Sequence, residues 1–472
     1  MDRRTFSIVF AAITIAVSVP SASEQTRPAG PVAIVGGMLV DGHGGQPLHH
    51  SVVVIEGAKI TAIGTVDTLK PPAGAAIVDG RGKTVLPGLI DLHCHVDIVG
   101  HGVYDEWHPV AKSRYKEVLP AESKAILMSG VTLGREPGGF LETDLWVRDS
   151  INRGDFPGPR RLVSGPYISF GDPASGDSGP HGDPNSPNAH YLMVNTAEGA
   201  REAAVFLLDR GVDLLKAYNG LTEPMVRAIT EEAHKRGKHV ASHVTGAEDL
   251  KMRIRAGIDS VEHLGNGRAG ASGNNYSPEI LDLLARTGIP IVPTLNVGLV
   301  YEETEQFPGR IEEPAALPGL PADLQDMVRA SLRNYSHLRY FDSKRAANSD
   351  LRRLFRQLLD AGVNVLMGSE AGTPLNFHAS AAAREMVWMN RLGMDPMAVI
   401  VASTRGPARF LKMDDRYGSI EVGKVADIIM VDGNPLQDMA VMHRVGFVMK
   451  EGVVFKGGSG PEPQSTATGA RK

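Results

Sequence analysis

Two histidines separated by a single residue, His93 and His95, end a mostly apolar run from Val85 to Leu92. Successive side chains of an extended strand point to opposite faces, so both imidazoles would share one face and Cys94 would take the other. Neutral imidazoles on one face can bind a divalent metal ion, and zinc or a neighbouring first-row transition metal suits such ligands. The same spacing occurs in ordinary buried strands, so the metal interpretation depends on further ligands elsewhere in the chain.

Four more side chains of ligand type follow short apolar runs later in the chain: Lys216, His243, His263 and Glu370. Lys216 is unusual among them, because an unpaired ammonium group is costly to bury. Such a lysine either reacts with CO2 to give a carbamate, an anionic group able to bridge two metal ions, or pairs with an acid. Both outcomes remain open from these residues alone.

The middle of the chain, residues 86–415, alternates short apolar runs with helical patterns. Several of these patterns end at a glycine that directly precedes an apolar run, as at Gly211, Gly237 and Gly362, and this order is typical of βα repeats. Candidate strands cover residues 85–92, 131–133, 161–163, 212–215, 239–243, 260–263, 289–293 and 363–367. Eight repeats close into a (β/α)8 TIM barrel with its active site at the C-terminal strand ends, so this α/β fold would place all six candidate ligands on one rim.

The segments outside the barrel are β-rich and punctuated by glycines. We expect residues 32–85 and 416–456 to form one small β-sandwich built from both ends of the chain. Residues 457–472 are rich in Gly, Ser, Pro and Thr, and we expect a disordered tail there. Residues 166–190 and 296–348 are predicted as long loops, the second with some helical sequence, and loops of this length are usually functional.

Composition narrows the class of protein and its location. The chain has 472 residues, 42% of them hydrophobic and 22% charged, and a formal net charge of −5. These values suit a globular protein and argue against a nucleic-acid surface, since no basic patch with interleaved aromatic residues is present. Its single cysteine permits no internal disulfide.

Residues 1–23 form a candidate export signal. Arg3 and Arg4 precede a weakly apolar run and then small residues, in the order of a twin-arginine signal, with an ordinary secretory signal as the alternative. The run is too short to be a stable membrane anchor, so we expect a periplasmic or secreted protein. Its partner would be a small-molecule substrate, and the sequence leaves open whether the protein is a homo-oligomer.

Several motifs resemble those of the amidohydrolase superfamily, over residues 32–456. The matching segments are PGLIDLHCH, GVDLLKAY, HVASHVTG, SVEHLG, NVLMGSEAG and GSIEVGKVADIIMVDGNPLQD. Within the superfamily, the chain looks closest to the imidazolonepropionase-like and Xaa-Pro or Xaa-Arg dipeptidase branch. The additional pieces that suggest this branch are residues 157–160, 181–182 and 403–409.

The resemblance implies a role for each candidate residue. Two Zn²⁺ ions would be bound, the more buried one by His93 and His95 and the more exposed one by His243 and His263. Carbamylated Lys216 would bridge them, and Glu370 would bind the buried metal and act as the catalytic proton acceptor. Two cations polarise the scissile carbonyl and lower the pKa of water, so that hydroxide exists near neutral pH. Tyr218 and His181 would contact the substrate.

The sequence departs from the family pattern at Glu370, where the family has Asp. One added methylene moves the carboxylate by roughly 1.3–1.5 Å, and misplacements near 1 Å cost on the order of a hundredfold in rate. The predicted activity is metal-dependent hydrolysis of a C–N bond, in a dipeptide or an N-acyl amino acid with a free carboxylate. The alternatives are a cyclic-amide, carbamate or urea hydrolase, and a catalytically weak relative that binds metal or ligand.

Overall fold

The computed structural model describes residues 28–171, 190–264, 275–313, 317–333, 335–337 and 339–457. The predicted export signal, nearly all of the predicted tail and the candidate substrate residue His181 lie outside the described residues. Within these ranges, no helix is both long enough and apolar enough to cross a membrane.

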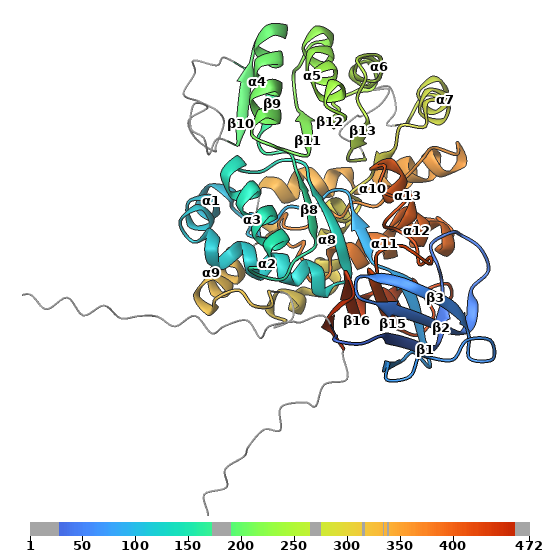
Figure 1. Ribbon diagram of the computed structural model, residues 1–472. Coiled ribbons are helices and arrows are strands. Elements are labelled where there is room, and N and C mark those ends of the chain that lie inside the picture. The colour runs from blue at the N-terminus through green and yellow to red at the C-terminus, as the bar shows by residue number, and fades with distance from the viewer. Residues whose placement is uncertain are drawn as a thin grey trace, which may run out of the picture.

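Both ends of the chain contribute to one β domain, where the blue and red strands lie side by side (Figure 1). Its strands form a single eight-stranded sheet in the order β17-β16-β15-β5-β1-β2-β3, with β4 paired to β1. The strand β5 joins the N-terminal and C-terminal strands of this sheet, because it pairs in parallel with β1 and antiparallel with β15. The strands are β1 (Val32–Leu39), β2 (Leu48–Glu56), β3 (Lys59–Thr65), β4 (Ala76–Asp79), β5 (Lys83–Pro87), β15 (Ile428–Asp432), β16 (Val445–Lys450) and β17 (Val453–Lys456).

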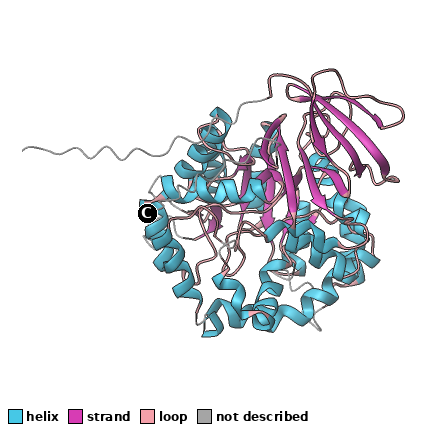
Figure 2. Ribbon diagram, turned by 90° about the horizontal axis from the view of Figure 1, so that it is seen from below, coloured by secondary structure: helices cyan, strands magenta, loops and turns pink. Residues whose placement is uncertain are grey.

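The middle of the chain folds as parallel strands surrounded by helices, and the strands lie inside the ring of helices when viewed from below (Figure 2). One sheet has the order β6-β7-β8 and the other β10-β9-β11-β12-β13-β14. The strands are β6 (Leu89–Asp91), β7 (Val131–Glu136), β8 (Arg160–Val163), β9 (Tyr167–Phe170), β10 (Tyr191–Val194), β11 (Leu214–Ala217), β12 (His239–His243), β13 (Ser260–Glu262) and β14 (Ile291–Val292).

Residues 363–371 lie between the two parallel sheets. Val365 forms a parallel bridge to Ile291 of β14, and Ala371 forms one to Cys94, which follows β6. On the other side, the backbone N–H of Asp213 donates to the carbonyl of Val163 in β8. Among the described residues, the parallel strands thus form two hydrogen-bonded sheets that residues 363–371 connect on one side, in agreement with the predicted arrangement of parallel strands surrounded by helices.

Helices cover the outside of the parallel strands. The α-helices are α1 (Tyr104–Ser113), α2 (Tyr115–Met128), α3 (Leu141–Arg153), α4 (Ala197–Asp209), α5 (Glu223–Lys235), α6 (Ala247–Arg255), α7 (Pro278–Thr287), α8 (Asn296–Gln306), α9 (Ala322–Leu332), α10 (Arg339–Asp360), α11 (Ala381–Arg391), α12 (Pro396–Ala402) and α13 (Arg405–Phe410). Short 3₁₀ helices span η1 (Pro308–Glu312), η3 (Tyr335–His337) and η4 (Met439–His443).

Three expectations about the elements need correction. The segment 296–348, predicted as a long loop, is mostly helical, because it contains α8, α9 and the start of α10. The segment 166–190 contains the strand β9, although its surrounding glycines and prolines favoured a loop. Residues 85–92 do not form one strand, since β5 belongs to the β domain and only β6 joins the parallel strands.

A buried ion pair joins the parallel-strand region to the β domain. Arg160 at the start of β8 donates to Asp427 at 2.9 Å and to Glu451 at 2.6 Å, and its guanidinium lies 4.1 Å from the ring centre of Tyr417. The exposed fractions of the Arg160 and Asp427 side chains are 12% and 6%, so removing one charge would leave the other poorly hydrated.

We expect Arg160→Met to lower the free energy of unfolding by about 3 kcal/mol, because a buried carboxylate loses its partner. Thermal and urea unfolding of purified protein would measure the change. The control is Arg286→Met, which breaks an exposed pair with Asp282 and should cost about 0.5 kcal/mol or less. Equal effects of the two variants would contradict this role of Arg160.

Candidate active site

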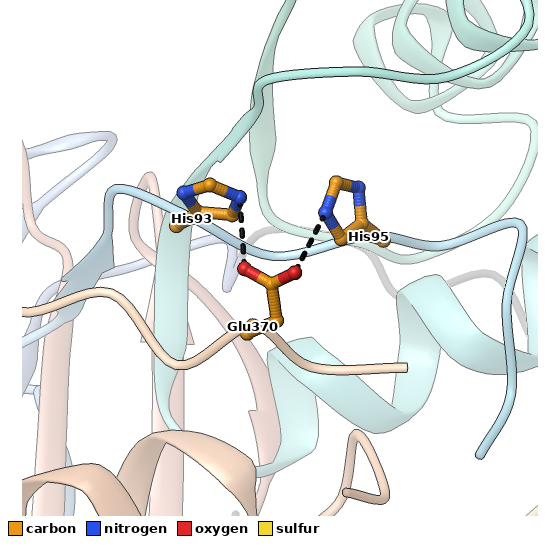
Figure 3. A group of neighbouring side chains, drawn as sticks. All are labelled: His93, His95 and Glu370. Atoms are coloured by element: carbon orange, nitrogen blue, oxygen red, sulfur yellow. Dashed lines mark ion pairs between the residues drawn. The ribbon is translucent and has the colours of Figure 1, made fainter. Parts of the chain in front are cut away.

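Three side chains meet at the C-terminal end of β6 (Figure 3). The Oε2 atom of Glu370 lies 2.9 Å from Nε2 of His93, and its Oε1 atom lies 3.7 Å from Nε2 of His95. All three offer ligand atoms within 4.8 Å of one another. His93 and His95 therefore do face the same side, although both follow the strand β6 rather than lying within it.

The remaining candidate ligands lie around this group. Nδ1 of His263, directly after β13, is 3.4 Å from Oε2 of Glu370. The ring centres of His263 and His93 are 4.6 Å apart, and those of His263 and His243 are 4.7 Å apart. Lys216 is 1% exposed, and its Nζ atom has no hydrogen-bond partner among the described residues. The structure thus brings four histidines, Lys216 and Glu370 to one place.

The electrostatics of this group suit metal ligands. Burial holds the pKa of His243 and the pKa of His263 well below the usual range, so both imidazoles are neutral. Burial would raise the pKa of Glu370, but His93 and His263 outweigh it and hold the pKa well below normal. Burial lowers the pKa of Lys216 to about 8, which makes its amine neutral at a lower pH than a free lysine.

A carboxylate and an arginine stand behind His93. Its Nδ1 atom is 2.7 Å from Oε2 of Glu262, and the other oxygen of Glu262 accepts from Nη2 of Arg135 at 2.6 Å. Nη1 of Arg135 also donates to Ser260 at 3.1 Å. A carboxylate on Nδ1 fixes the ring orientation and presents Nε2 toward Glu370.

A second carboxylate and arginine stand behind His95 in the same manner. Nδ1 of His95 contacts Glu136, whose other oxygen accepts from Nη2 of Arg161 at 2.7 Å and from the backbone N–H of Val96 at 2.9 Å. Burial lowers the pKa of His95, but the charges of Glu136 and Glu370 raise it well above normal in the absence of a competing cation. Both Nε2 atoms are thus directed to the same carboxylate.

The backbone that carries Glu370 is held from two sides. Asp91 accepts from the backbone N–H of Ser369 at 3.0 Å and from its hydroxyl at 2.5 Å. Nδ2 of Asn376 donates to the carbonyls of Ser369 and Glu370, both at 2.8 Å. Glu370 has a φ of +54°, which is uncommon for a residue with a side chain, and these contacts maintain it.

A cavity of about 300 Å³ lies next to the candidate ligands. Its lining includes His95, His243, His263 and Glu370 together with Tyr218, which follows β11. The ring centres of Tyr218 and His243 are 4.6 Å apart. Tyr218 therefore lies beside the candidate ligands, where a substrate would contact it.

Sequence reasoning missed several residues of this site. It gave no role to Glu136, Glu262, Arg161 or Asn376. The signal for Glu262 was present, because a carboxylate in the apolar strand Ser260–Glu262 must be paired when it is buried. Two further histidines lie near the site: His108 lines the cavity, and His378 contacts the carbonyl of His95 at 2.6 Å.

These residues fit a divalent metal centre. The possible donor atoms belong to imidazoles and a carboxylate. His93 and His95 are each oriented by a carboxylate of their own. The Nζ atom of Lys216, which has no hydrogen-bond partner among the described residues, is buried next to the group. Such a centre at the C-terminal ends of parallel strands is typical of metal-dependent hydrolases.

The chain belongs to the amidohydrolase family, whose model matches residues 84–455. The family is metal-dependent, and the protein is a hydrolase that acts on carbon–nitrogen bonds. It is 25% identical to the ochratoxinase of Aspergillus niger over 485 residues, which cover 94% of this chain and 90% of that protein.

Two further comparisons agree with the expected branch. The chain is 22% identical to the imidazolonepropionase of Alkaliphilus oremlandii over 447 residues, covering 86% of this chain and 90% of that protein. Among solved structures, it resembles a Xaa-Pro dipeptidase with bound methionine in the active site, with a TM-score of 0.71 and 26% identity, covering 91% of this chain and 100% of that chain. The resemblance to the imidazolonepropionase-like and dipeptidase branch is confirmed.

We expect Glu262→Gln to weaken metal binding by about tenfold to a hundredfold, because the ring of His93 loses its orienting charge. Competition with a chelator would give the dissociation constant. The matched control is Glu232→Gln, which alters a pair with Arg201 between α5 and α4 and should leave the constant unchanged. An unaltered constant in Glu262→Gln would contradict this role.

We expect Asn376→Ala to lower kcat by about tenfold or more, because the backbone of Glu370 loses two hydrogen bonds and the carboxylate shifts. The control is Asn390→Ala, which removes a bond to the carbonyl of Met394 at the end of α11. Steady-state kinetics would separate the variants, and equal kcat values would show that Asn376 does not position Glu370.

Proposed function

We propose that this protein is a metal-dependent amidohydrolase that cleaves the amide bond of a dipeptide or an N-acyl amino acid. The observation that carries the proposal is the position of the Glu370 carboxylate, between His93, His95 and His263 and beside the buried Lys216. The name of the similar Xaa-Pro dipeptidase supports the peptide-like substrate class.

The charge balance of the site supports two metal ions and a carbamate. Glu136 and Glu262 are each paired with an arginine, so neither has an unmet charge. Among the described residues, the ion-pair partners of Glu370 are histidines, and Lys216 has no acid within hydrogen-bond distance. A divalent cation beside Glu370 and a carbamate on Lys216 would satisfy both groups, and a buried, uncompensated charge would otherwise cost several kcal/mol.

In this proposal His93, His95 and Glu370 would hold one zinc-type ion, His243 and His263 would hold another, and carbamylated Lys216 would be a ligand common to both. The metal ions would polarise the substrate carbonyl and activate water at neutral pH. Glu370 accepts the proton of the attacking water and passes it to the leaving nitrogen. The hydroxyl of Tyr218 donates a hydrogen bond to the substrate carbonyl, because burial raises its pKa and keeps it protonated.

The fold and the location complete the proposal. We infer that residues 363–371 supply the eighth strand position of a closed (β/α)8 barrel, since they bond to β14 on one side and to residues 92–95 on the other. Export of the chain through residues 1–23 to the periplasm or outside the cell, and a possible homo-oligomeric state, remain predictions.

We expect purified protein to contain about two equivalents of divalent metal per chain, because two ligand groups share one bridging position. Elemental analysis would measure the content, with His243→Ala as the variant expected to lose one equivalent. A single equivalent in the unaltered protein would argue against the carbamylated lysine. Retention of full metal content and rate by His243→Ala would contradict the ligand assignment.

We expect the recovery of metal-stripped protein in bicarbonate and zinc to accelerate about tenfold from pH 6 to pH 7, at constant dissolved CO2, and to level off above pH 8. Only the neutral amine attacks CO2, and a pKa of about 8 for Lys216 sets that fraction. The recovery of amide hydrolysis would be followed over time. Lys216→Arg should recover no activity at any pH, and a rate independent of pH would contradict the carbamate.

The alternative of a catalytically weak relative rests on Glu370. The backbone of residues 369–370 is held by Asp91 and Asn376, so a shorter Asp at this position would withdraw its carboxylate by roughly 1.3–1.5 Å. We expect Glu370→Asp to lower kcat/KM by about a hundredfold, with Glu370→Gln as the control that removes the charge at constant length. A large gain for Glu370→Asp would instead identify a weakened site.

A further inference from the structure

Six aromatic side chains line the cavity besides the candidate ligands, and we call them the aromatic wall: Tyr104, His108, Tyr167, His190, Tyr191 and Tyr218. They come from α1, β9, β10 and the ends of β10 and β11. They account for most of the lining outside the candidate metal ligands. The wall is therefore the surface that the non-reacting part of a substrate would contact.

The rings of the aromatic wall form a continuous series that begins at the candidate ligand His243. The ring centres of Tyr218 and Tyr167 are 4.7 Å apart, and those of Tyr167 and His190 are 4.9 Å apart. The series continues from His190 to His108 at 5.7 Å and from His108 to Tyr104 at 5.5 Å. A substrate whose carbonyl reached the histidines would have ring faces and edges along its remaining length.

The chain positions these rings by specific backbone features. Tyr191 and Tyr167 are register partners in the parallel pair of β10 and β9, so their side chains lie next to each other. Tyr167 packs against Gly138, which has a φ of +143°, and a Cβ atom at that glycine would lie 2.1 Å from the tyrosine ring. Any side chain at position 138 would clash with the ring of Tyr167, so the position of Tyr167 requires a glycine there.

The charge of the lining limits what the wall can bind. Among the described residues that line the cavity there is no lysine or arginine, and the acids are Asp97 and Glu370. An anionic group against the wall would lose hydration without a counter-ion. A cationic group there would lie close to the proposed divalent metal ions. A neutral group therefore suits the wall best.

We propose that the substrate presents a neutral aromatic ring to the aromatic wall, adjacent to the C–N bond that is cleaved. Aromatic rings stack face to face or edge to face at the spacings found in this wall, and such pairs contribute beyond the apolar area they bury. The cavity of about 300 Å³ is at the small end of ligand pockets, which suits one ring and an amide. The preference rests on the proposed amide hydrolysis, and Tyr191 would be a residue that determines it.

The experiment compares pairs of substrates that differ only in ring saturation, with metal-loaded protein. N-benzoyl-alanine is paired with N-cyclohexanecarbonyl-alanine, and N-acetyl-phenylalanine with N-acetyl-cyclohexylalanine, so that the ring lies on either side of the scissile bond. We expect kcat/KM to be at least about fivefold higher for the aromatic member of one pair. Equal values in both pairs, or faster hydrolysis of N-acetyl-lysine, would overturn the proposal.

Variants at Tyr191 connect the preference to the wall. Tyr191→Leu should reduce the ratio of kcat/KM for the aromatic substrate to kcat/KM for its saturated counterpart about fivefold, mainly through KM of the aromatic substrate. Tyr191→Phe should retain the preference, because it keeps the ring. Phe170→Leu is the control, since Phe170 lies on β9 but is 50% exposed and does not line the cavity. A uniform loss for both members of the pair in Tyr191→Leu would indicate a merely structural role.

Binding measurements separate this proposal from the proposed reaction. Calorimetric titration of metal-loaded protein with benzamide and with cyclohexanecarboxamide tests ring recognition, and chromatography of the titrated mixtures shows whether either amide is hydrolysed. Tighter binding of benzamide, by about fivefold or more, with no hydrolysis of any amide would support the wall and reject the reaction. Equal affinities together with amide hydrolysis would reject the wall and leave the reaction standing.

Discussion

The site depends on the way in which buried carboxylates are paired with buried cations. Glu136 and Glu262 each use one oxygen for a histidine and the other for an arginine. All four partners are enclosed by the fold, where an uncompensated charge costs several kcal/mol. The arginines neutralise the two carboxylates, so the carboxylates can orient the imidazoles without adding net charge. The histidines are thus held in one orientation before any metal arrives.

Among the candidate ligands that the structure describes, Glu370 and Lys216 have no such dedicated partner, and both lie at the same place. Glu370 meets only imidazoles, and Lys216 has no partner among the described residues. Structural ion pairs elsewhere in the chain, such as Arg160 with Asp427, are complete by themselves. The incomplete charges therefore mark the part of the site that requires something from outside the polypeptide.

Much of the chemistry could be predicted from the sequence, because it follows from short-range rules. Alternation along a strand predicted that His93 and His95 share a face, and the cost of burying an ammonium singled out Lys216. Glycines after helices located most of the parallel strands, and the parallel arrangement predicted that the ends of distant strands meet. The amidohydrolase family and the hydrolysis of a C–N bond are confirmed by the comparisons.

Other parts of the site could not be predicted, because they depend on contacts between segments distant in sequence. The pairing of Glu262 with Arg135 spans 127 positions, and nothing local in either segment identifies the partner. Asn376 acts on the unusual backbone of Glu370 by donating to the carbonyls of Ser369 and Glu370. These two hydrogen bonds exist only in the folded structure, and no local sequence pattern indicates them. The free-energy cost of burying an unpaired charge could have identified Glu262 from the sequence, as it identified Lys216.

Residues at the rim of the pocket, which a substrate would contact, could also not be predicted from the sequence. Tyr167 and Tyr191 come from β9 and β10, which flank a stretch that glycine and proline content assigned to a loop. Neither strand belongs to the βα repeat, so periodicity could not place them. The candidate metal ligands lie at the ends of regular elements and are predictable from those elements, whereas Tyr167 and Tyr191 of the proposed aromatic wall lie on strands outside the repeat. In this proposal, reaction class and substrate preference are encoded in different ways, and only the first can be read from the repeating pattern of the chain.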